Sequence, residues 1–131
     1  MIFIEVPVGE APRIVNLHPN ALRAILGFVS FAHPFEDENI GLAHDDDGIA
    51  NGRLPNRTIG SEIIPGPFFV CRFNDGKLCD LLPSDIEKYT SLFAEPEAFP
   101  PGHWTVHNKV EEKEQSFVLY MISEWVKDGE E

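Results

Sequence analysis

One stretch of the chain constrains the fold more than any other: PFFVCRFNDGKLCDLL, residues 67–82. Two segments rich in apolar residues flank Asp75-Gly76, a dipeptide typical of the two-residue turn of a β-hairpin. Such a turn sets the register of both strands, because residues directly opposite each other share one face of the sheet. The expected facing pairs are Asn74 with Lys77, Phe73 with Leu78, and Arg72 with Cys79.

This register also decides whether the two cysteines of the chain, Cys71 and Cys79, can form a disulfide. Successive side chains of a strand point to opposite faces, so a two-residue loop places the two thiols on opposite sides of the sheet. A three-residue loop would instead pair them directly. We predict the two-residue loop and free thiols, which also agrees with the reducing environment of a cytoplasm.

The remaining patterns predict a small α+β protein. IFIEV and PRIVNL alternate apolar and polar residues around a Pro-Val-Gly-Glu turn, which indicates a second hairpin. VSFAHPF and IGLAH read as two strands joined by an acidic turn. Helices are expected at 19–27 and at 83–93, the latter capped by Ser84 or its neighbour and turning Ile86, Tyr89 and Phe93 to one face. The predicted fold class is a single domain with a small mixed or antiparallel sheet and two to three helices.

The segment DDDGIANGRLPNRTIGSE, residues 45–62, is rich in residues that favour turns, and we predict a loop without strands there. It carries two arginines in a chain of formal net charge -12. In the structural interpretation, Arg57 holds the loop on the acidic turn and Asn56 binds loose backbone groups. In the functional interpretation, the loop is a phosphate or nucleotide pocket or a protein-contact loop. Its candidate ligand- or partner-binding residues are Arg53, Asn56, Arg57, Asp45 and Asp46.

Motifs for metal binding and catalysis are absent from the sequence. HDDDG resembles part of a calcium loop, but its three carboxylates are adjacent and the glutamate of an EF-hand is missing. His103 and His107 stand four residues apart without an HExxH motif. No nucleophile elbow, Walker loop or dinucleotide motif occurs. We therefore expect no metal and no cofactor, and we keep a small hydrolase only as a third class of function.

Charge narrows the classes of partner. The excess of acids disfavours direct binding of nucleic acid, since phosphates require a basic surface, whereas a basic protein partner is compatible with it. Residues 61–131 hold fourteen acids and six bases, so the second half is the more acidic. No apolar run reaches the length of a membrane span and no signal peptide opens the sequence, so we expect a cytoplasmic protein without a membrane partner.

The C-terminal region forms a separate expectation. Three prolines in AEPEAFPPGHW separate a domain at 1–99 from an extension at 100–131. Within the extension a helix is predicted at about 109–126, with a strand at SFVLYMI as the alternative. Either the extension packs on the domain, or its aromatic residues form a partner surface, for example in a homodimer. The surface residues are Phe117, Tyr120, Met121 and Trp125.

The order of several motifs resembles a family that is known only as a domain of unknown function, numbered three-eight-four-six in that series. The motifs are LRAILGF, HDDDG, LPNR, PGPFFV, NDGK and LLPSDIEKY, which together span about residues 1–95. Asp45 stands where the family often has an asparagine. The resemblance implies a small α+β domain and a setting in phages and mobile elements, and it implies no catalytic residues.

These observations lead to two competing mechanisms for a non-catalytic accessory protein of a phage or mobile element that acts in counter-defence in the host cytoplasm. In the first, an acidic surface binds a basic host protein. In the second, the loop at Asn56 and Arg57 sequesters a small phosphorylated or nucleotide-like signal.

Overall fold

A computed structural model describes residues 1–100 of the chain. Eight strands and two helices follow one another within these residues. Their order is β1 (Ile2–Val6), β2 (Arg13–Asn16), α1 (Asn20–Leu26), β3 (Val29–Ala32), β4 (Ile40–Asp45), β5 (Pro55–Ile59), β6 (Glu62–Pro65), β7 (Phe68–Asn74), β8 (Lys77–Cys79) and α2 (Pro83–Leu92). No helix in this part of the chain is long and apolar enough to cross a membrane.

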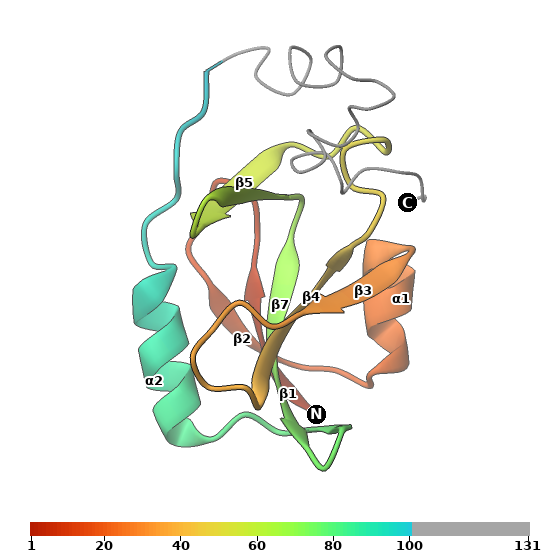
Figure 1. Cartoon of the computed structure of the whole chain (residues 1–131), viewed down its shortest axis with the longest axis vertical. Helices are drawn as coiled ribbons and strands as arrows, with labels where there is room; N and C mark the ends of the chain where they lie inside the picture. The colour runs from red at the N-terminus through yellow and green to blue at the C-terminus, as the bar shows by residue number, and fades with distance from the viewer. Residues whose placement is uncertain (101–131) are drawn as a thin grey trace.

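The main sheet has the strand order β2-β1-β7-β4-β3, and β8 pairs with β7 outside this path (Figure 1). Every pairing among the described strands is antiparallel. The hairpin of β7 and β8 has the predicted register, in which Arg72 faces Cys79. Cys71 is buried, Cys79 is partly exposed, and both thiols are free, as the two-residue loop requires. The predicted α+β class is therefore confirmed, with a wholly antiparallel sheet and two helices in the described residues.

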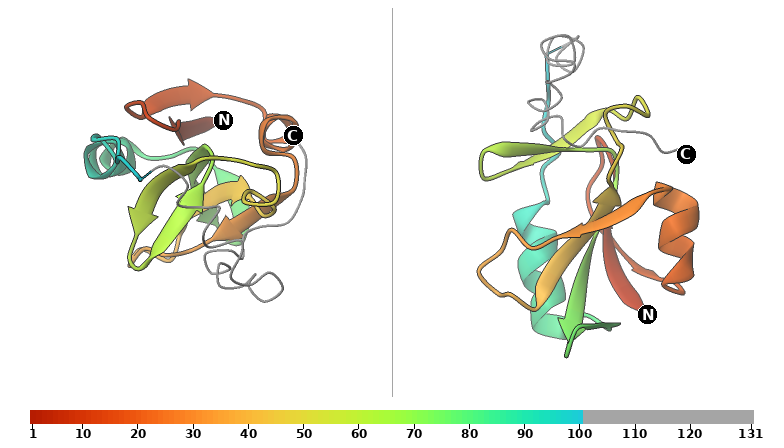
Figure 2. Two further views of the ribbon diagram at one scale, coloured as in Figure 1. Left: turned by 90° about the horizontal axis from the view of Figure 1, so that it is seen from above. Right: turned by 45° about the vertical axis from the view of Figure 1, so that its right-hand side comes forward.

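The two faces of the sheet carry separate hydrophobic cores. On one face α1 covers the sheet through Leu22 and Leu26, which pack against Phe3 and Phe69. On the other face α2 and the β5–β6 hairpin cover Ile4, Leu42 and Val70, which belong to a larger cluster. Seen from above, the two helices lie on opposite sides of the sheet (Figure 2). The alternation of each strand thus supplies apolar side chains to both layers.

The predicted helices are present, but the cap of α2 differs from the prediction. Tyr89 and Phe93 are buried on one face of α2 and Ile86 packs against them, as expected. The helix begins at Pro83, a residue suited to the first helical position, so Ser84 lies inside the first turn. The carboxylate of Asp85 accepts the backbone N–H of Leu82 at 2.8 Å and thereby caps the helix.

The prediction of a strand-free loop at 45–62 is wrong. Pro55–Ile59 and Glu62–Pro65 form a second, two-stranded antiparallel sheet. Gly60 and Ser61 form the two-residue turn between them, and Gly60 has φ of 64°, a conformation that glycine adopts without strain. Because Ile64 is buried in the core, packing stabilises these two strands. In the sequence, the many turn-favouring residues of the segment predicted a loop instead.

The chain after α2 runs back toward β5. The side chain of Glu97 accepts hydrogen bonds from the backbone N–H of Thr58 at 3.0 Å and from its hydroxyl at 2.7 Å. The predicted helix at 109–126, its candidate surface residues, and His103 and His107 lie outside the described residues. The boundary of the extension at residue 100 therefore stays a prediction.

Candidate functional site

The two residues at the centre of the functional hypothesis, Asn56 and Arg57, sit at a bulge in β5. Pro55 faces Pro65 and Arg57 faces Ile64, so the register shifts and Asn56 has no facing residue. In a regular strand two neighbouring side chains point to opposite faces, but a bulge reorients one of them. Both side chains consequently point inward, and each residue is only 1% exposed.

Arg57 directs its guanidinium to backbone carbonyls. Its Nη2 donates to Phe93 O at 2.9 Å and to Glu10 O at 2.8 Å, and its Nη1 donates to Asn56 Oδ1 at 2.7 Å. Phe93 closes the C-terminal end of α2, where the helix dipole favours a positive charge. The pKa of Arg57 is lowered by its burial. Arg57 therefore joins α2, the β1–β2 turn and the β5 bulge.

Asn56 completes this cluster. Its amide nitrogen donates to Val6 O at 2.8 Å and to Gly66 O at 2.9 Å, while its oxygen accepts from Arg57. The prediction that Asn56 binds loose backbone groups is confirmed. The prediction that Arg57 holds the acidic turn is wrong, because its hydrogen-bond partners are carbonyl oxygens from other segments. Both residues use their hydrogen-bonding groups inside the fold, so the geometry does not favour a phosphate pocket at this position.

The acidic turn is held by Arg53 instead. Arg53 Nε lies 2.6 Å from Oδ2 of Asp45, whose side chain is fully buried. The same carboxylate accepts the side-chain amide of Asn51 and the backbone N–H of Asp47, both at 2.9 Å. Arg53 Nη2 donates to the backbone oxygens of Ile25 and Leu26 at the end of α1. Asp45 therefore organises the turn after β4, and Arg53 connects it to α1.

A glycine makes room for Arg53. Gly66 has φ of 77°, and a Cβ at this position would collide with Cδ of Arg53. The PGPFF motif thus serves two purposes, because Gly66 also supplies the carbonyl that Asn56 binds. The structure brings Arg53 to Asp45 and Asn56 to Arg57. Asp46 is only partly exposed, and its N–H donates to Phe28 O at 2.7 Å.

His44 and Asp47 are also buried at this end of β4. Burial lowers the pKa of His44, so its imidazole is held in the neutral form despite the neighbouring carboxylates. Within residues 1–100 no three His, Cys, Asp or Glu side chains are grouped to hold a metal ion. His44 is therefore a buried, neutral side chain at the end of β4 that leads into the acidic turn.

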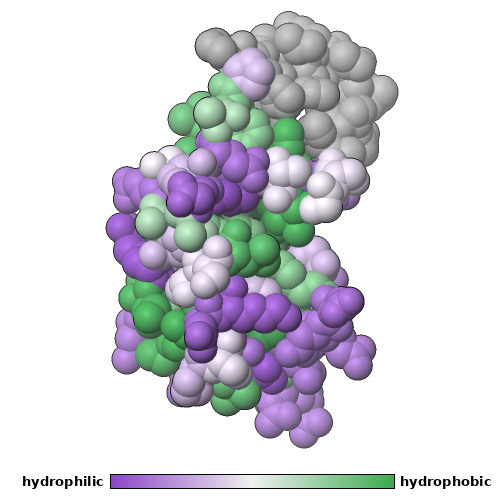
Figure 3. Space-filling view, turned by 90° about the vertical axis from the view of Figure 1, so that its left-hand side faces the viewer, coloured by the Kyte–Doolittle hydropathy of each residue, from purple (hydrophilic) through white to green (hydrophobic). Residues whose placement is uncertain are grey.

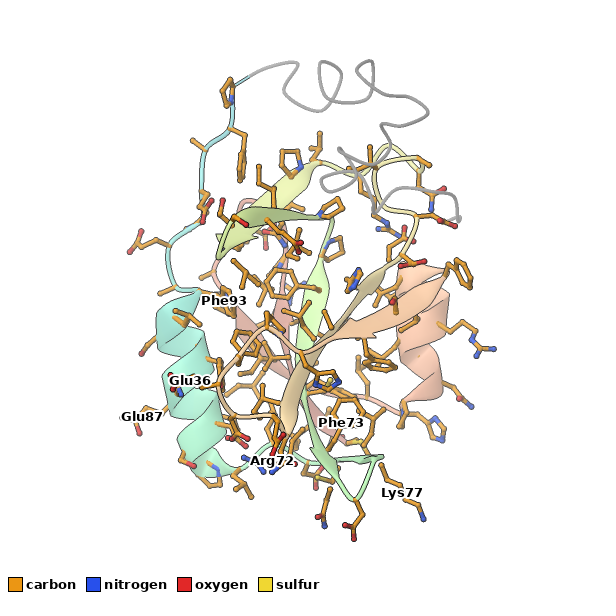
Figure 4. The ribbon with its side chains drawn as sticks, in the orientation of Figure 1. Glu36, Arg72, Phe73, Lys77, Glu87 and Phe93 are labelled. Atoms are coloured by element: carbon orange, nitrogen blue, oxygen red, sulfur yellow. The ribbon has the colours of Figure 1, made fainter. Side chains whose placement is uncertain are left out.

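A third arginine, which the sequence reasoning missed, is Arg72 of β7. Its Nε and Nη2 fork onto the carboxylate of Asp85 at 2.7 and 3.0 Å, and Nη2 also reaches Asp37 at 3.2 Å. Figure 4 shows Arg72 beside the lower end of α2, opposite Phe93 at the upper end. Both ends of α2 are therefore held by arginines. The DIEKY motif contains the acid, but nothing local in the sequence indicates its partner.

The exposed charges of the described residues are mostly negative. Four basic residues of the described chain are exposed, namely Arg13, Arg23, Lys77 and Lys88. Nine exposed acids oppose them: Glu10, Glu36, Glu38, Glu62, Asp75, Asp80, Glu87, Glu95 and Glu97. Arg13 is itself paired with Glu5 at 2.9 Å. Figure 3 shows hydrophilic side chains in purple across the face that carries α2, with hydrophobic groups in green between them. The candidate site is the acidic surface, which we define as the nine exposed acids named above.

Comparisons with known proteins identify the family alone. The family model described as Domain of unknown function (DUF3846) matches residues 1–94, which include every helix and strand described above. A search of the curated proteins and a search of the solved structures found no match. The matched span ends just after α2 and includes all three internal arginines.

Proposed function

The chain belongs to the DUF3846 family, and from this premise we propose that it is a non-catalytic protein that binds a basic surface of another protein. The phage and mobile-element setting that the sequence resemblance implies makes the partner a host protein and the role counter-defence. The binding surface in this proposal is the acidic exterior of the domain, and the partner carries clustered lysine or arginine side chains.

One observation carries the proposal: among the described residues, nine acidic side chains but four basic ones are exposed. Arg53, Arg57 and Arg72 each bind groups within the protein, and two of them are paired with the buried carboxylates of Asp45 and Asp85. An exterior of one dominant sign attracts a partner of the opposite sign and accelerates the encounter. The exposed surface of the described residues therefore carries the net negative charge that a basic partner would meet.

The mechanism that follows is competition for a basic face. A host protein that binds nucleic acid presents lysines and arginines to phosphate groups. Carboxylates on a folded domain can occupy the same side chains through charge-assisted hydrogen bonds. The domain needs no reaction and no cofactor for this task, and its buried Asp45 serves the acidic turn.

The experiment uses the full chain and a lysine decapeptide as probe, with affinity measured at low ionic strength. Replacing Glu36 and Glu38 with glutamine should weaken binding about fivefold, because two exposed pairs contribute about 0.5 kcal/mol each. Replacing Arg23 and Lys77 with glutamine is the matched control and should strengthen binding. The proposal would be refuted if the wild-type chain did not bind the peptide. It would also be refuted if both pairs of substitutions changed the affinity in the same direction.

A further inference from the structure

Strand β3 forms one edge of the main sheet. It is the terminal strand of the order β2-β1-β7-β4-β3 and pairs only with β4 among the described strands (Figure 1). An edge strand presents backbone N–H and C=O groups that can pair with another chain. Proteins often shield such an edge with charges or proline, but the segment from Phe28 to Ala32 contains neither.

The hydrogen bonds of β3 show which of its groups face outward. The N–H of Asp46 donates to Phe28 O, and the register places these two residues opposite each other at the end of the ladder. In an antiparallel pair, hydrogen-bonded and non-hydrogen-bonded positions alternate. Ser30 and Ala32 therefore bond to β4, whereas the N–H and C=O of Val29 and Phe31 point to the open edge.

An aromatic ledge lies beside this edge, formed by Phe31, His33 and Phe73. The ring of Phe31 meets that of Phe73 edge-on at 5.4 Å, and the ring of His33 lies 5.2 Å from Phe73. Gly41 leaves room for His33, since a Cβ there would approach its Cε1 to 2.9 Å. Phe31 is 41% exposed although it sits in a sheet. The ledge thus offers apolar and π-surface next to unpaired backbone groups.

Carboxylates flank the edge at both ends. Asp46 lies opposite Phe28 at the start of β3, and it remains partly exposed. Beyond the other end, the turn to β4 carries the exposed Glu36 and Glu38. A strand paired with β3 would therefore have negative charge near both of its ends. This arrangement complements a segment that carries basic residues.

We propose that β3 is the docking edge for an extended basic segment of the partner, which adds to the sheet as a further strand. Backbone hydrogen bonds to Val29 and Phe31 hold the segment, and its side chains on the face of Phe31 contact the aromatic ledge. Arginine is well suited to that face, because its cation is attracted to aromatic rings. The inference rests on the proposed function and names the part of the acidic surface that carries it.

The test compares two substitutions at one position in the full chain. The probe is a peptide of about ten residues that alternates arginine and valine, a pattern suited to a strand. Phe31→Ala and Phe31→Pro both remove the ring, but only proline removes the outward N–H, and edge strands tolerate it there. We expect alanine to weaken binding a few-fold and proline to weaken it by at least a further factor of ten. Thermal unfolding of both variants checks the fold.

A second measurement needs no variant. Hydrogen exchange of the wild-type chain, resolved by residue, should show that the amides of Val29 and Phe31 become protected when the peptide binds. Unchanged exchange at both amides, or equal affinities for the two variants, would overturn the edge-strand inference. If the lysine decapeptide still binds in that case, the acidic surface stands without the edge. If neither peptide binds, the proposed function fails as well.

Discussion

At the scale of single residues, the fate of each arginine depends on local backbone geometry. Arg53 and Arg57 stand in one short segment and look alike in the sequence. Arg53 finds a fully buried carboxylate, whereas the bulge turns Arg57 toward carbonyl oxygens. The sequence pattern indicated a structural role for this segment but assigned the acidic turn to the wrong arginine. No reliable local sequence pattern marks a bulge, and a bulge reverses the direction in which a side chain points.

The cluster of Asn56 and Arg57 gives a prediction about stability. Arg57→Ala should lower the free energy of unfolding by about 3 kcal/mol, because several buried carbonyls lose their donor. Asn56→Ala should cost about 2 kcal/mol for the same reason. The double variant should lose about 1 kcal/mol less than the sum, since the two side chains bind each other. Urea denaturation measures all three values.

The exposed Arg13→Ala is the control for these variants and should leave stability almost unchanged. Strict additivity would show that Asn56 and Arg57 act independently. A stable Arg57→Ala protein would show that this guanidinium does not hold α2 and the β1–β2 turn together.

At the scale of secondary structure, local patterns predicted the elements whose signals are short in range. The two-residue turn gave the register of β7 and β8, and helical spacing gave the buried face of α2. The hairpin of β5 and β6 was not predicted, because Gly60-Ser61 is one of several turn signals in the same segment. The contacts of Arg57 and Arg72 with the two ends of α2 were also not predicted, because no local pattern links these strand residues to the helix.

The N-terminal tie of α2 predicts a dependence on pH. Arg72 donates two hydrogen bonds to Asp85, and this contact lowers the pKa of the carboxyl below its usual value. A carboxyl with a lowered folded-state pKa adds stability above its unfolded-state pKa of about 4, and this stability is lost as pH falls through the folded-state value. Asp85→Asn should therefore be less stable than wild type at pH 6, and the difference should shrink toward pH 2.

Denaturant unfolding of wild type and Asp85→Asn across this pH range provides the measurement. Asp75→Asn, in the exposed turn of the β7–β8 hairpin, is the control and should show no such convergence. A stability difference that is the same at pH 6 and pH 2 would contradict an ionic contribution from the contact between Arg72 and Asp85.

At the scale of the whole molecule, the distribution of charge connects fold and proposed function. The formal net charge of -12 was readable from the sequence, but its placement was not. Internal arginines contact α1, α2 and the acidic turn, and the exposed charges of the described residues are mostly carboxylates. The open edge at β3 then gives this exterior a place where a partner can align. Internal arginines and their buried carboxylate partners thus serve the fold, and the proposed recognition role belongs to the exposed acids.

The most direct test of the central claim is the affinity of the full chain for the lysine decapeptide as a function of salt. Exposed charges are screened over about 10 Å at 0.1 M salt and about 3 Å at 1 M. If acids on the surface bind a basic partner, the dissociation constant measured by fluorescence anisotropy should rise at least tenfold between about 50 and 500 mM sodium chloride. An affinity that stays constant over this range would contradict the account.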